Sequence, residues 1–429
     1  MRLRPWRTAG TILLAGLLVG LPAACSNSKS NTSTSTKPGQ TCQSPNERQG
    51  VSATEIRIGG MASKTNPLGF DYSQAWSGAE AYFDMVNSKG GVFGRKLNLV
   101  DKEDDQALNN TQATQRLITQ ANVFAVAPVA SLLFTGGNLL AQNCIPTFGW
   151  NINPQWSSGP SLFGDKGSNL NFKAPSTGAA WLTKKLGKKK VAILAYNIDE
   201  SKQCATGITN TYKHFPVAKV AFTDSAVPYP VTDLSGDVSA MKRAGVDIVA
   251  ACVDVNGMGA IAREMRKQNF NATMYLPDGY YDQIKTDPNF NGSYVLTFFT
   301  PLETKNPPPG LRDFLTWMKK RNAPVSEISL SGWISADMLV TGIKAAGKDF
   351  TRSKVVAALN GMTDYSANGI LPPIDWTIAH TDKWNPGCAA YSVVRNGKFV
   401  PQFAKDGKPF LCFPSNLPAG QPPEPSYKS

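Results

Sequence analysis

Histidine is almost missing from this chain of 429 residues, which contains only His214 and His380. The cysteines form no C-x-x-C pair and no cluster with histidine, so we expect no metal site and no cofactor. The acidic run at residues 101–105 lacks the spacing of a calcium loop and is predicted to be a solvated turn. The G-x-S-x-G, H-E-x-x-H and paired-carboxylate patterns of hydrolases are also absent. An exported enzyme is therefore a weak alternative, and we expect that the chain is not an enzyme.

Long apolar runs are also lacking after the first 25 residues, so we expect that the mature chain does not cross a bilayer. Residues 1–24 have the layout of a secretory signal peptide, with three arginines, a short apolar stretch and small residues before the cleavage site. Cys25 follows directly, and this segment resembles the bacterial lipoprotein box, although Pro22 stands where that box usually has leucine. The resemblance implies that Cys25 carries lipid after cleavage and anchors the protein to the membrane.

Residues 25–41 are rich in serine and threonine and cannot bury apolar area, so we expect a flexible tether. The net charge is +13, of which the three arginines of the signal peptide contribute three, leaving +10. The basic residues are scattered along the chain, which argues against nucleic acid as a partner. Attraction to anionic lipids or wall polymers is the expected consequence of this charge.

Six cysteines remain once Cys25 is set aside, and an even number in an exported chain indicates disulfides. Six cysteines allow fifteen pairings. We expect each bridge to lie within one lobe, because a bridge between lobes would lock a hinge. The predicted pairs are Cys42–Cys144, Cys204–Cys252 and Cys388–Cys412.

Strand and helix patterns alternate along the chain, which predicts an α/β fold with doubly wound parallel sheets. The first series has strands at 55–60, 96–101, 123–129 and 145–150 and helices at 74–87, 107–121 and 131–142. The second series has strands at 190–196, 218–223, 247–253 and 273–276. Its helices lie at 177–186, 235–244 and 257–268, and a further helix follows the strand 190–196 and ends at residue 212. Helices at 310–320, 331–346 and 351–360 and a hairpin around Asn396-Gly397 follow, and the proline-rich tail from Pro414 is predicted to be loose.

Residues 79–105 combine a helix, a Gly90-Gly91 turn, Gly94, a strand and an acidic end. This pattern resembles the branched-chain amino-acid binding-protein family, which has the type I periplasmic binding-protein fold, and the resemblance covers nearly the whole mature chain. It implies two lobes joined by a three-segment hinge, with 42–155 plus 301–382 as lobe one and 156–300 plus 383–429 as lobe two. It also implies a monomer that closes on a small molecule and delivers it to an ABC permease at the outer face of the cell membrane.

Ligands of open parallel sheets bind beyond the carboxyl ends of the strands, and this rule selects six candidate residues. In lobe one these are Ser131, predicted to begin a helix, and the pair Trp150 and Asn151. In lobe two they are Tyr196, Asp254 and Asp278.

The family resemblance implies that Ser131 grips a carboxylate and that Asp278 faces an ammonium. The aromatic residues leave an aromatic or amide-bearing ligand open. A ligand-sensing protein of the same fold stays the main alternative function.

Overall fold

Two sheets organise residues 42–385 and 387–428, the part of the chain that our computed structural model describes. The first sheet has the order β2-β1-β3-β4-β5, and all its strand pairs are parallel. Its strands are β1 (Glu55–Ala62), β2 (Lys96–Asp104), β3 (Ala125–Ala130), β4 (Thr147–Gly149) and β5 (Leu162–Gly164). The connections contain α1 (Gln74–Ser88), α2 (Asn110–Thr119), α3 (Gly137–Gln142) and the 3₁₀ helix η1 (Pro154–Ser158). Helical crossovers of this kind are what parallel pairing requires.

The second sheet has nine strands, in the order β14-β13-β11-β10-β9-β8-β6-β7 with β12 paired to β11. Its parallel part is β6 (Lys190–Tyr196), β7 (Lys219–Val227), β8 (Ile248–Cys252), β9 (Thr273–Leu276) and β10 (Tyr294–Thr297). Helix α4 (Thr177–Lys185) precedes β6, and the helices between these strands are α5 (Asp199–His214), α6 (Ser235–Arg243), α7 (Val255–Lys267), α8 (Asp282–Thr286) and the 3₁₀ helix η2 (Pro288–Phe290). The alternation predicted from the sequence therefore produces a second parallel layer.

Antiparallel strands extend this second sheet beyond what the sequence predicted. They are β11 (Cys388–Arg395), β12 (Lys398–Gln402), β13 (Phe410–Cys412) and β14 (Ser426–Lys428). The hairpin around Asn396-Gly397 is confirmed as the turn between β11 and β12. The prediction of a loose tail is wrong, because β14 pairs with β13 and the Glu424 carboxylate accepts a hydrogen bond of 3.2 Å from the Trp181 indole.

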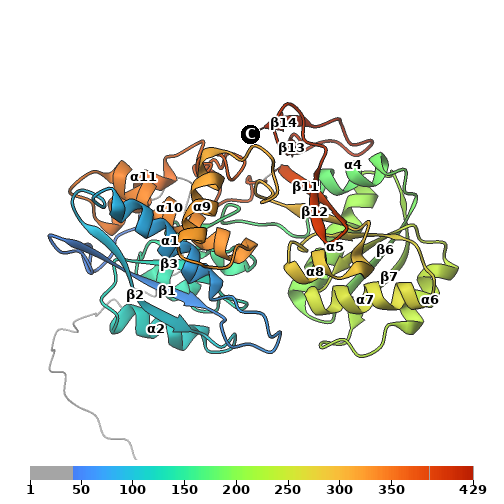
Figure 1. The fold of residues 1–429 in the computed structure, drawn as a ribbon, viewed down its shortest axis with the longest axis horizontal. Helices are drawn as coiled ribbons and strands as arrows, with labels where there is room; N and C mark the ends of the chain where they lie inside the picture. The colour runs from blue at the N-terminus through green and yellow to red at the C-terminus, as the bar shows by residue number, and fades with distance from the viewer. Residues whose placement is uncertain (1–41, 386, 429) are drawn as a thin grey trace, which may run out of the picture. The chain divides into compact units, whose positions relative to one another are not determined.

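Three helices that follow the second sheet's parallel part in sequence pack in lobe one: α9 (Pro309–Lys320), α10 (Glu327–Ala346) and α11 (Arg352–Asn360). Figure 1 shows α10, in orange, beside α1, in blue, although the two helices are more than 200 residues apart in the chain. The buried Asp337 of α10 accepts hydrogen bonds of 2.8 Å from the hydroxyls of Tyr82 and Tyr365. Lobe one therefore consists of the first sheet with α1–α3 and α9–α11.

Glycines bring α1 and α10 into direct backbone contact. A Cβ atom added to Gly78 would lie 1.8 Å from the backbone oxygen of Ser329, and one added to Gly332 would lie 2.0 Å from that of Ala75. Real Cβ atoms do not approach so closely, so only glycine permits this crossing. The crossing positions the first turn of α10, where Glu327 lies, beside the loops that follow the first sheet's strands.

Three segments connect the two lobes: residues 165–176, 298–308 and 361–387. The sequence predicted that lobe one ends at residue 155, but β5 pairs in parallel with β4, so the first sheet continues to Gly164. β5 was missed because its three residues show no periodicity. Hydrogen bonds join the first of these segments to the third. Ser168 and Asn169 both donate backbone hydrogen bonds to the Ala379 carbonyl, and the Trp384 indole donates one of 2.9 Å to the Lys166 carbonyl.

Three disulfides join Cys42 to Cys144, Cys204 to Cys252 and Cys388 to Cys412, which are the three pairs predicted from the sequence. The first ties the start of the described chain to the residues before β4, and the other two lie within the second lobe. No helix among residues 42–385 and 387–428 has the length and apolar character of a membrane span. The predicted signal peptide, Cys25 and the tether lie outside the described residues.

Candidate functional site

A buried lysine, Lys166, lies where polar residues from both lobes come together. It follows β5, and its side chain is only 9% exposed. Its Nζ atom lies 3.9 Å from Oδ1 of Asp165 and 3.9 Å from Oε1 of Glu327. The same atom lies 5.8 Å from the ring centres of Trp150 and of Phe298. We use the name Lys166 cluster for Trp150, Asp165, Lys166, Asp278 and Glu327 with the flanking rings of Tyr72 and Tyr281.

Three carboxyl groups surround this one ammonium group, and their mutual influence shifts several pKa values. Burial raises the pKa of Glu327 to about 8, with a further rise from Asp278 that Lys166 partly offsets. Asp278 is exposed at its surface, but the protein atoms packed around it remove part of its hydration and so raise its pKa. The charge of Lys166 opposes this rise. Burial alone would lower the pKa of Lys166, but the charges of Asp165, Glu327 and Asp278 raise it above its ordinary value. Lys166 therefore stays charged, whereas Glu327 is mainly protonated at neutral pH.

A series of aromatic rings runs past the charged groups from lobe one to lobe two. The ring of Trp150 lies 5.3 Å from that of Tyr72, and Phe70 lies 5.0 Å from Tyr72 and 5.4 Å from Tyr281. The Tyr281 hydroxyl donates to Oδ2 of Asp278 at 3.3 Å. Phe70 and Tyr72 come from the loop after β1, and Tyr281 precedes α8, so the rings belong to both lobes. Such an arrangement can enclose a flat or apolar group next to the charges.

Trp150 and Asp278 are the two predicted site residues that the structure places in the Lys166 cluster. Both follow the carboxyl end of a strand, as the prediction assumed. The Trp150 indole N–H is directed toward the Glu327 carboxyl and lowers its pKa, yet it makes no hydrogen bond of normal geometry to any described residue. That these two residues bind a ligand stays a prediction, and their positions at strand ends agree with it.

Tyr196 and Asp254 form a pair of their own in lobe two. The Tyr196 hydroxyl donates to Oδ1 of Asp254 at 2.5 Å, and the same oxygen accepts a hydrogen bond of 2.8 Å from the backbone of Gly257 at the start of α7. The ring of Tyr229 lies 5.0 Å from that of Tyr196. The charges of Asp278 and Asp254 both raise the pKa of Tyr72, after the larger effect of burial, so this pair lies within electrostatic range of the aromatic series.

Ser131 and Asn151 make their contacts inside lobe one. The prediction that Ser131 begins a helix is wrong, because α3 begins at Gly137 and the Ser131 hydroxyl accepts a hydrogen bond of 3.0 Å from Asn110. Asn110 also accepts from the backbone of Gly136 at 2.8 Å and so holds the intervening residues out of the helix. The Asn151 side chain donates to the carbonyls of Gly167 and Ser168, and its backbone donates to Asp165 at 3.0 Å. These two residues shape the loops around the site.

The acidic run at 101–105 is not the solvated turn that the sequence predicted. Its first four residues belong to β2, and Asp105 is fully buried. Asp105 accepts hydrogen bonds from the Ser63 hydroxyl at 2.7 Å and from Asn110 at 2.8 Å. Among the described residues no group of three histidine, cysteine or acidic side chains could hold a metal ion.

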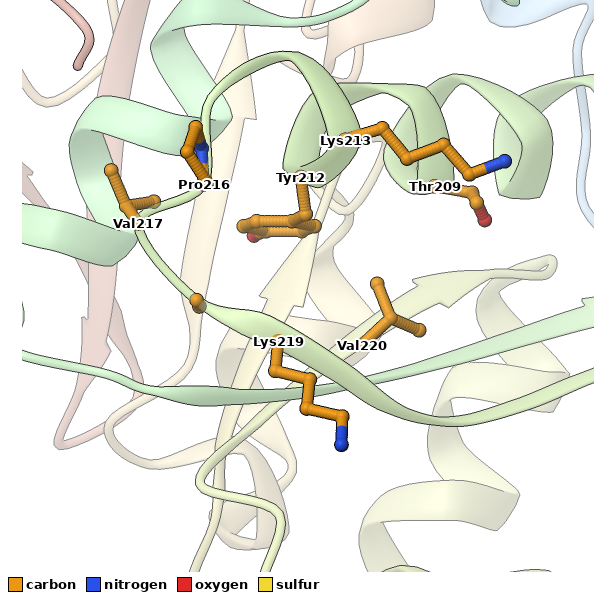
Figure 2. A pocket seen from close by; sticks show the side chains of 8 residues that line it. Thr209, Tyr212, Lys213, Pro216, Val217, Lys219 and Val220 are labelled. Carbon is orange, nitrogen blue, oxygen red and sulfur yellow. The ribbon is translucent and has the colours of Figure 1, made fainter. Parts of the chain in front are cut away.

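A hollow of about 550 Å³ lies in lobe two, and no residue of the Lys166 cluster lines it. Figure 2 shows the side chains around it. Its lining is Thr209, Tyr212, Lys213, Pro216, Val217, Ala218, Lys219 and Val220. These residues belong to the end of α5, the beginning of β7 and the loop between them, whereas ligands of parallel sheets bind at the carboxyl ends of strands. Neither labelled lysine extends its ammonium group into the hollow in this view.

The architecture, with two parallel sheets whose carboxyl ends supply one group of polar and aromatic residues, agrees with a sequence comparison. The sequence profile of the periplasmic binding protein family matches residues 55–398. The chain belongs to this family. It is thus a binding protein and not an enzyme. Its two histidines are used in other contacts, His214 with the Leu417 carbonyl and His380 with Asn360.

The following relatives of this periplasmic binding protein are distant in sequence. The Leu/Ile/Val-binding protein homolog 3 of Brucella melitensis is 22% identical over 352 residues, which cover 78% of this chain and 92% of that protein. Among solved structures, a substrate-binding periplasmic protein of Ralstonia solanacearum has a TM-score of 0.68 at 18% identity and covers 81% of this chain and 100% of that one. A fatty acid ABC transporter substrate-binding protein of Thermomonospora curvata has a TM-score of 0.65 at 18% identity, and the match covers 87% of this chain and 97% of that one. Identities this low show the shared fold alone.

Proposed function

We propose that this protein captures a small molecule between its two lobes by hinge closure and delivers it to an ABC permease. The observation that carries the proposal is the Lys166 cluster, to which lobe one contributes Trp150 and Glu327, the connecting segment 165–176 contributes Lys166, and lobe two contributes Asp278 and Tyr281. A ligand that contacts both groups at once stabilises the closed arrangement of the lobes. The name of the Thermomonospora relative includes an ABC transporter, which supports this role.

The six residues predicted from the sequence take different parts in the proposed site. Trp150 and Asp278 contact the ligand directly, because both have polar groups that the protein leaves largely unused. Tyr196 and Asp254 form a wall of the site in lobe two. Ser131 and Asn151 hold the loops of lobe one in place. The lobes of this proposal are residues 42–164 with 309–360, and 177–297 with 388–429.

Lipid on Cys25 and the tether at 25–41 would hold the binding protein at the outer face of the cell membrane. This part of the proposal rests on the signal layout and on the small residues before Cys25. The disulfide between Cys42 and Cys144 then supports it, because it fixes the first described residue to lobe one directly after the tether. The anchor would act on lobe one and leave lobe two free to move.

Replacing Asp278 tests the ligand site. We expect Asp278→Ala to remove the ligand-dependent rise in melting temperature that a screen of amino acids, amides, aromatic acids, fatty acids and short peptides detects for the wild type. The melting temperature of the empty variant should stay within a few degrees of the wild type, since the carboxylate is exposed and has one long hydrogen bond. Asp282→Ala is the matched control, because Asp282 is an exposed acid four residues away. An unchanged ligand response in Asp278→Ala would remove this residue from the site.

A further inference from the structure

Four N–H groups of the Lys166 cluster have no hydrogen-bond acceptor among the described residues. Three belong to the ammonium group of Lys166, whose nearest carboxylate oxygens lie 3.9 Å away, beyond hydrogen-bond length. The fourth is the indole N–H of Trp150, which is buried. The Trp150 N–H is buried without a partner, and the Lys166 ammonium has only ionic contacts of 3.9 Å, so a ligand that supplies acceptors would complete both groups.

The carboxyl groups of the cluster offer fewer open positions than their number suggests. Asp165 already accepts hydrogen bonds of 3.0 Å from the Asn151 backbone and of 2.7 Å from the Ser331 hydroxyl. Glu327 carries a proton at neutral pH, because its pKa lies at about 8, and thus adds a fifth donor. Asp278 accepts one hydrogen bond of 3.3 Å and keeps open acceptor positions, so the groups of the cluster that lack a partner of the opposite kind are the donors of Lys166 and Trp150. A carboxylate would bring two oxygens that accept up to four hydrogen bonds.

Apolar side chains surround these donors. Phe70, Tyr72 and Tyr281 form the aromatic series beside the charges. Large hydrophobic side chains are also exposed two or three residues after three strand ends, with Leu133 36%, Ile198 41% and Tyr229 41% exposed. Single exposed apolar residues are ordinary, but these follow the edges at which parallel sheets bind ligands. The body of a ligand held here is therefore expected to be apolar.

We propose that the ligand is an organic monocarboxylate with an apolar body, whose carboxylate accepts hydrogen bonds from Lys166 and Trp150. This inference rests on the proposed function and adds the class of ligand to it. The protonated Glu327 donates to the same carboxylate, and Asp165 and Asp278 keep Lys166 charged while no anion is bound. The net charge of +10 that remains without the three arginines of residues 1–24 attracts anions to the protein. Lys166 is the residue that determines specificity, because it is the one cation of the cluster.

Isothermal titration calorimetry of the exported chain at pH 7 tests this assignment with three matched sets of probes. The acids are benzoate and octanoate, the neutral analogues are benzamide and octanamide, and the cations are benzylamine and octylamine. We expect one or both acids to bind at least tenfold more tightly than their amides and the amines to show no binding. Lys166→Met should weaken binding of the acid roughly 10- to 100-fold, the usual effect of removing a hydrogen bond from a charged donor.

Two control variants separate recognition from folding. Lys166→Arg keeps the charge and the donors and should retain the preference for the acid over its amide. Lys173→Met removes an exposed lysine from the same connecting segment and should leave the affinity unchanged. Equal affinity of the wild type and Lys166→Met for an acid would overturn the role of Lys166.

The class of ligand and the proposed function can fail separately. If amines or zwitterionic amino acids bind and the acids do not, the monocarboxylate class is wrong and the binding function stands. If neither these probes nor the wider screen yields any binder, both the class of ligand and the proposed function are rejected.

Discussion

Glu327 shows how neighbouring groups decide the charge of a buried acid. Its residue is 7% exposed and lies in the first turn of α10, where a helix favours a negative charge. Burial and two nearby carboxylates outweigh that preference and raise its pKa to about 8. The titratable groups that face Glu327 are the acids Asp165 and Asp278, the cation Lys166 and the phenols of Tyr72, Tyr280 and Tyr281.

Replacing Glu327 by glutamine should change how stability depends on pH. A pKa raised above its ordinary value of 4.5 means that the native state holds the proton more tightly than the unfolded chain. The stability from this group is fully present below about pH 4.5 and is lost as the pH rises through about 8. We expect Glu327→Gln to gain stability relative to the wild type over this range, on the order of a few kcal/mol.

Denaturant unfolding at several pH values between 4.5 and 9 measures this difference. Glu200→Gln is the control for the loss of one acidic side chain, because Glu200 is exposed on α5. A constant difference in unfolding free energy between Glu327→Gln and the wild type across that range would contradict the raised pKa.

Single residues of the site were predictable only where a clear strand preceded them. Trp150 and Asp278 could be selected because they follow strands with a recognisable pattern. Lys166 was missed because β5 has three residues. Glu327 was missed because the helix was predicted to begin at residue 331, whereas Ser326 caps it with its side chain and with a reciprocal bond to Ser329. The usual sequence signal of such a capping box has Glu or Gln at that third position.

At the scale of elements, the periodicity of apolar residues predicted most helices and strands. Hydrogen bonds of local side chains make several of these elements begin or end at other residues than predicted. Thr351 caps α11, because its side chain accepts a hydrogen bond from the Lys354 backbone. The second helix begins at Asn110 and not at residue 107, because Gln106 and Ala107 have positive φ angles of 50° and 64° and Asp105 binds the Ala107 backbone. Strands of three or four residues, such as β13 and β14, have too few positions for alternation to show.

The crossing of α1 and α10 leads to a prediction about Gly332. We expect Gly332→Ala to lower the free energy of unfolding by roughly 1–3 kcal/mol, because the new methyl group forces the backbone of α1 away. Gly236→Ala is the control, since Gly236 lies in α6 with no atom within 4 Å of an added Cβ, and alanine there should be neutral or stabilising. Equal unfolding free energies for the two variants, measured in denaturant, would show that the helices can separate without cost.

For the whole molecule, the alternating pattern was enough to predict two doubly wound lobes, but not where the chain passes between them. The predicted boundary at residue 155 ignored β5, and the bonds from Ser168 to Ala379 and from Trp384 to Lys166 join segments more than 200 residues apart. Periodicity reports only local structure, so contacts of this kind leave no trace in it. The hydrogen bonds between the connecting segments hold Lys166 in place, and this residue belongs both to the proposed ligand site and to the connection between the lobes.

The proposed lipid anchor can be tested in the cell. We expect Cys25→Ala to move the protein from the membrane fraction to the medium or the soluble fraction. Alanine has no sulfur to carry the lipid, so the protein would lose its anchor. Immunoblotting of fractionated cells measures the distribution, and the ligand affinity of the released protein should equal that of the wild type. Retention of Cys25→Ala in the membrane fraction would show that another part of the chain holds it there.

Hinge closure is the motion on which the transport proposal depends, and small-angle X-ray scattering can detect it. Contacts from both lobes to one ligand lower the free energy of the closed arrangement only, so saturating ligand should shift the population toward it. We expect the radius of gyration of the wild type to fall when a ligand found by calorimetry is added. Asp278→Ala with the same compound should show no change, because lobe two loses its contact. A constant radius of gyration at a ligand concentration that saturates the wild type would reject closure as the mechanism of capture.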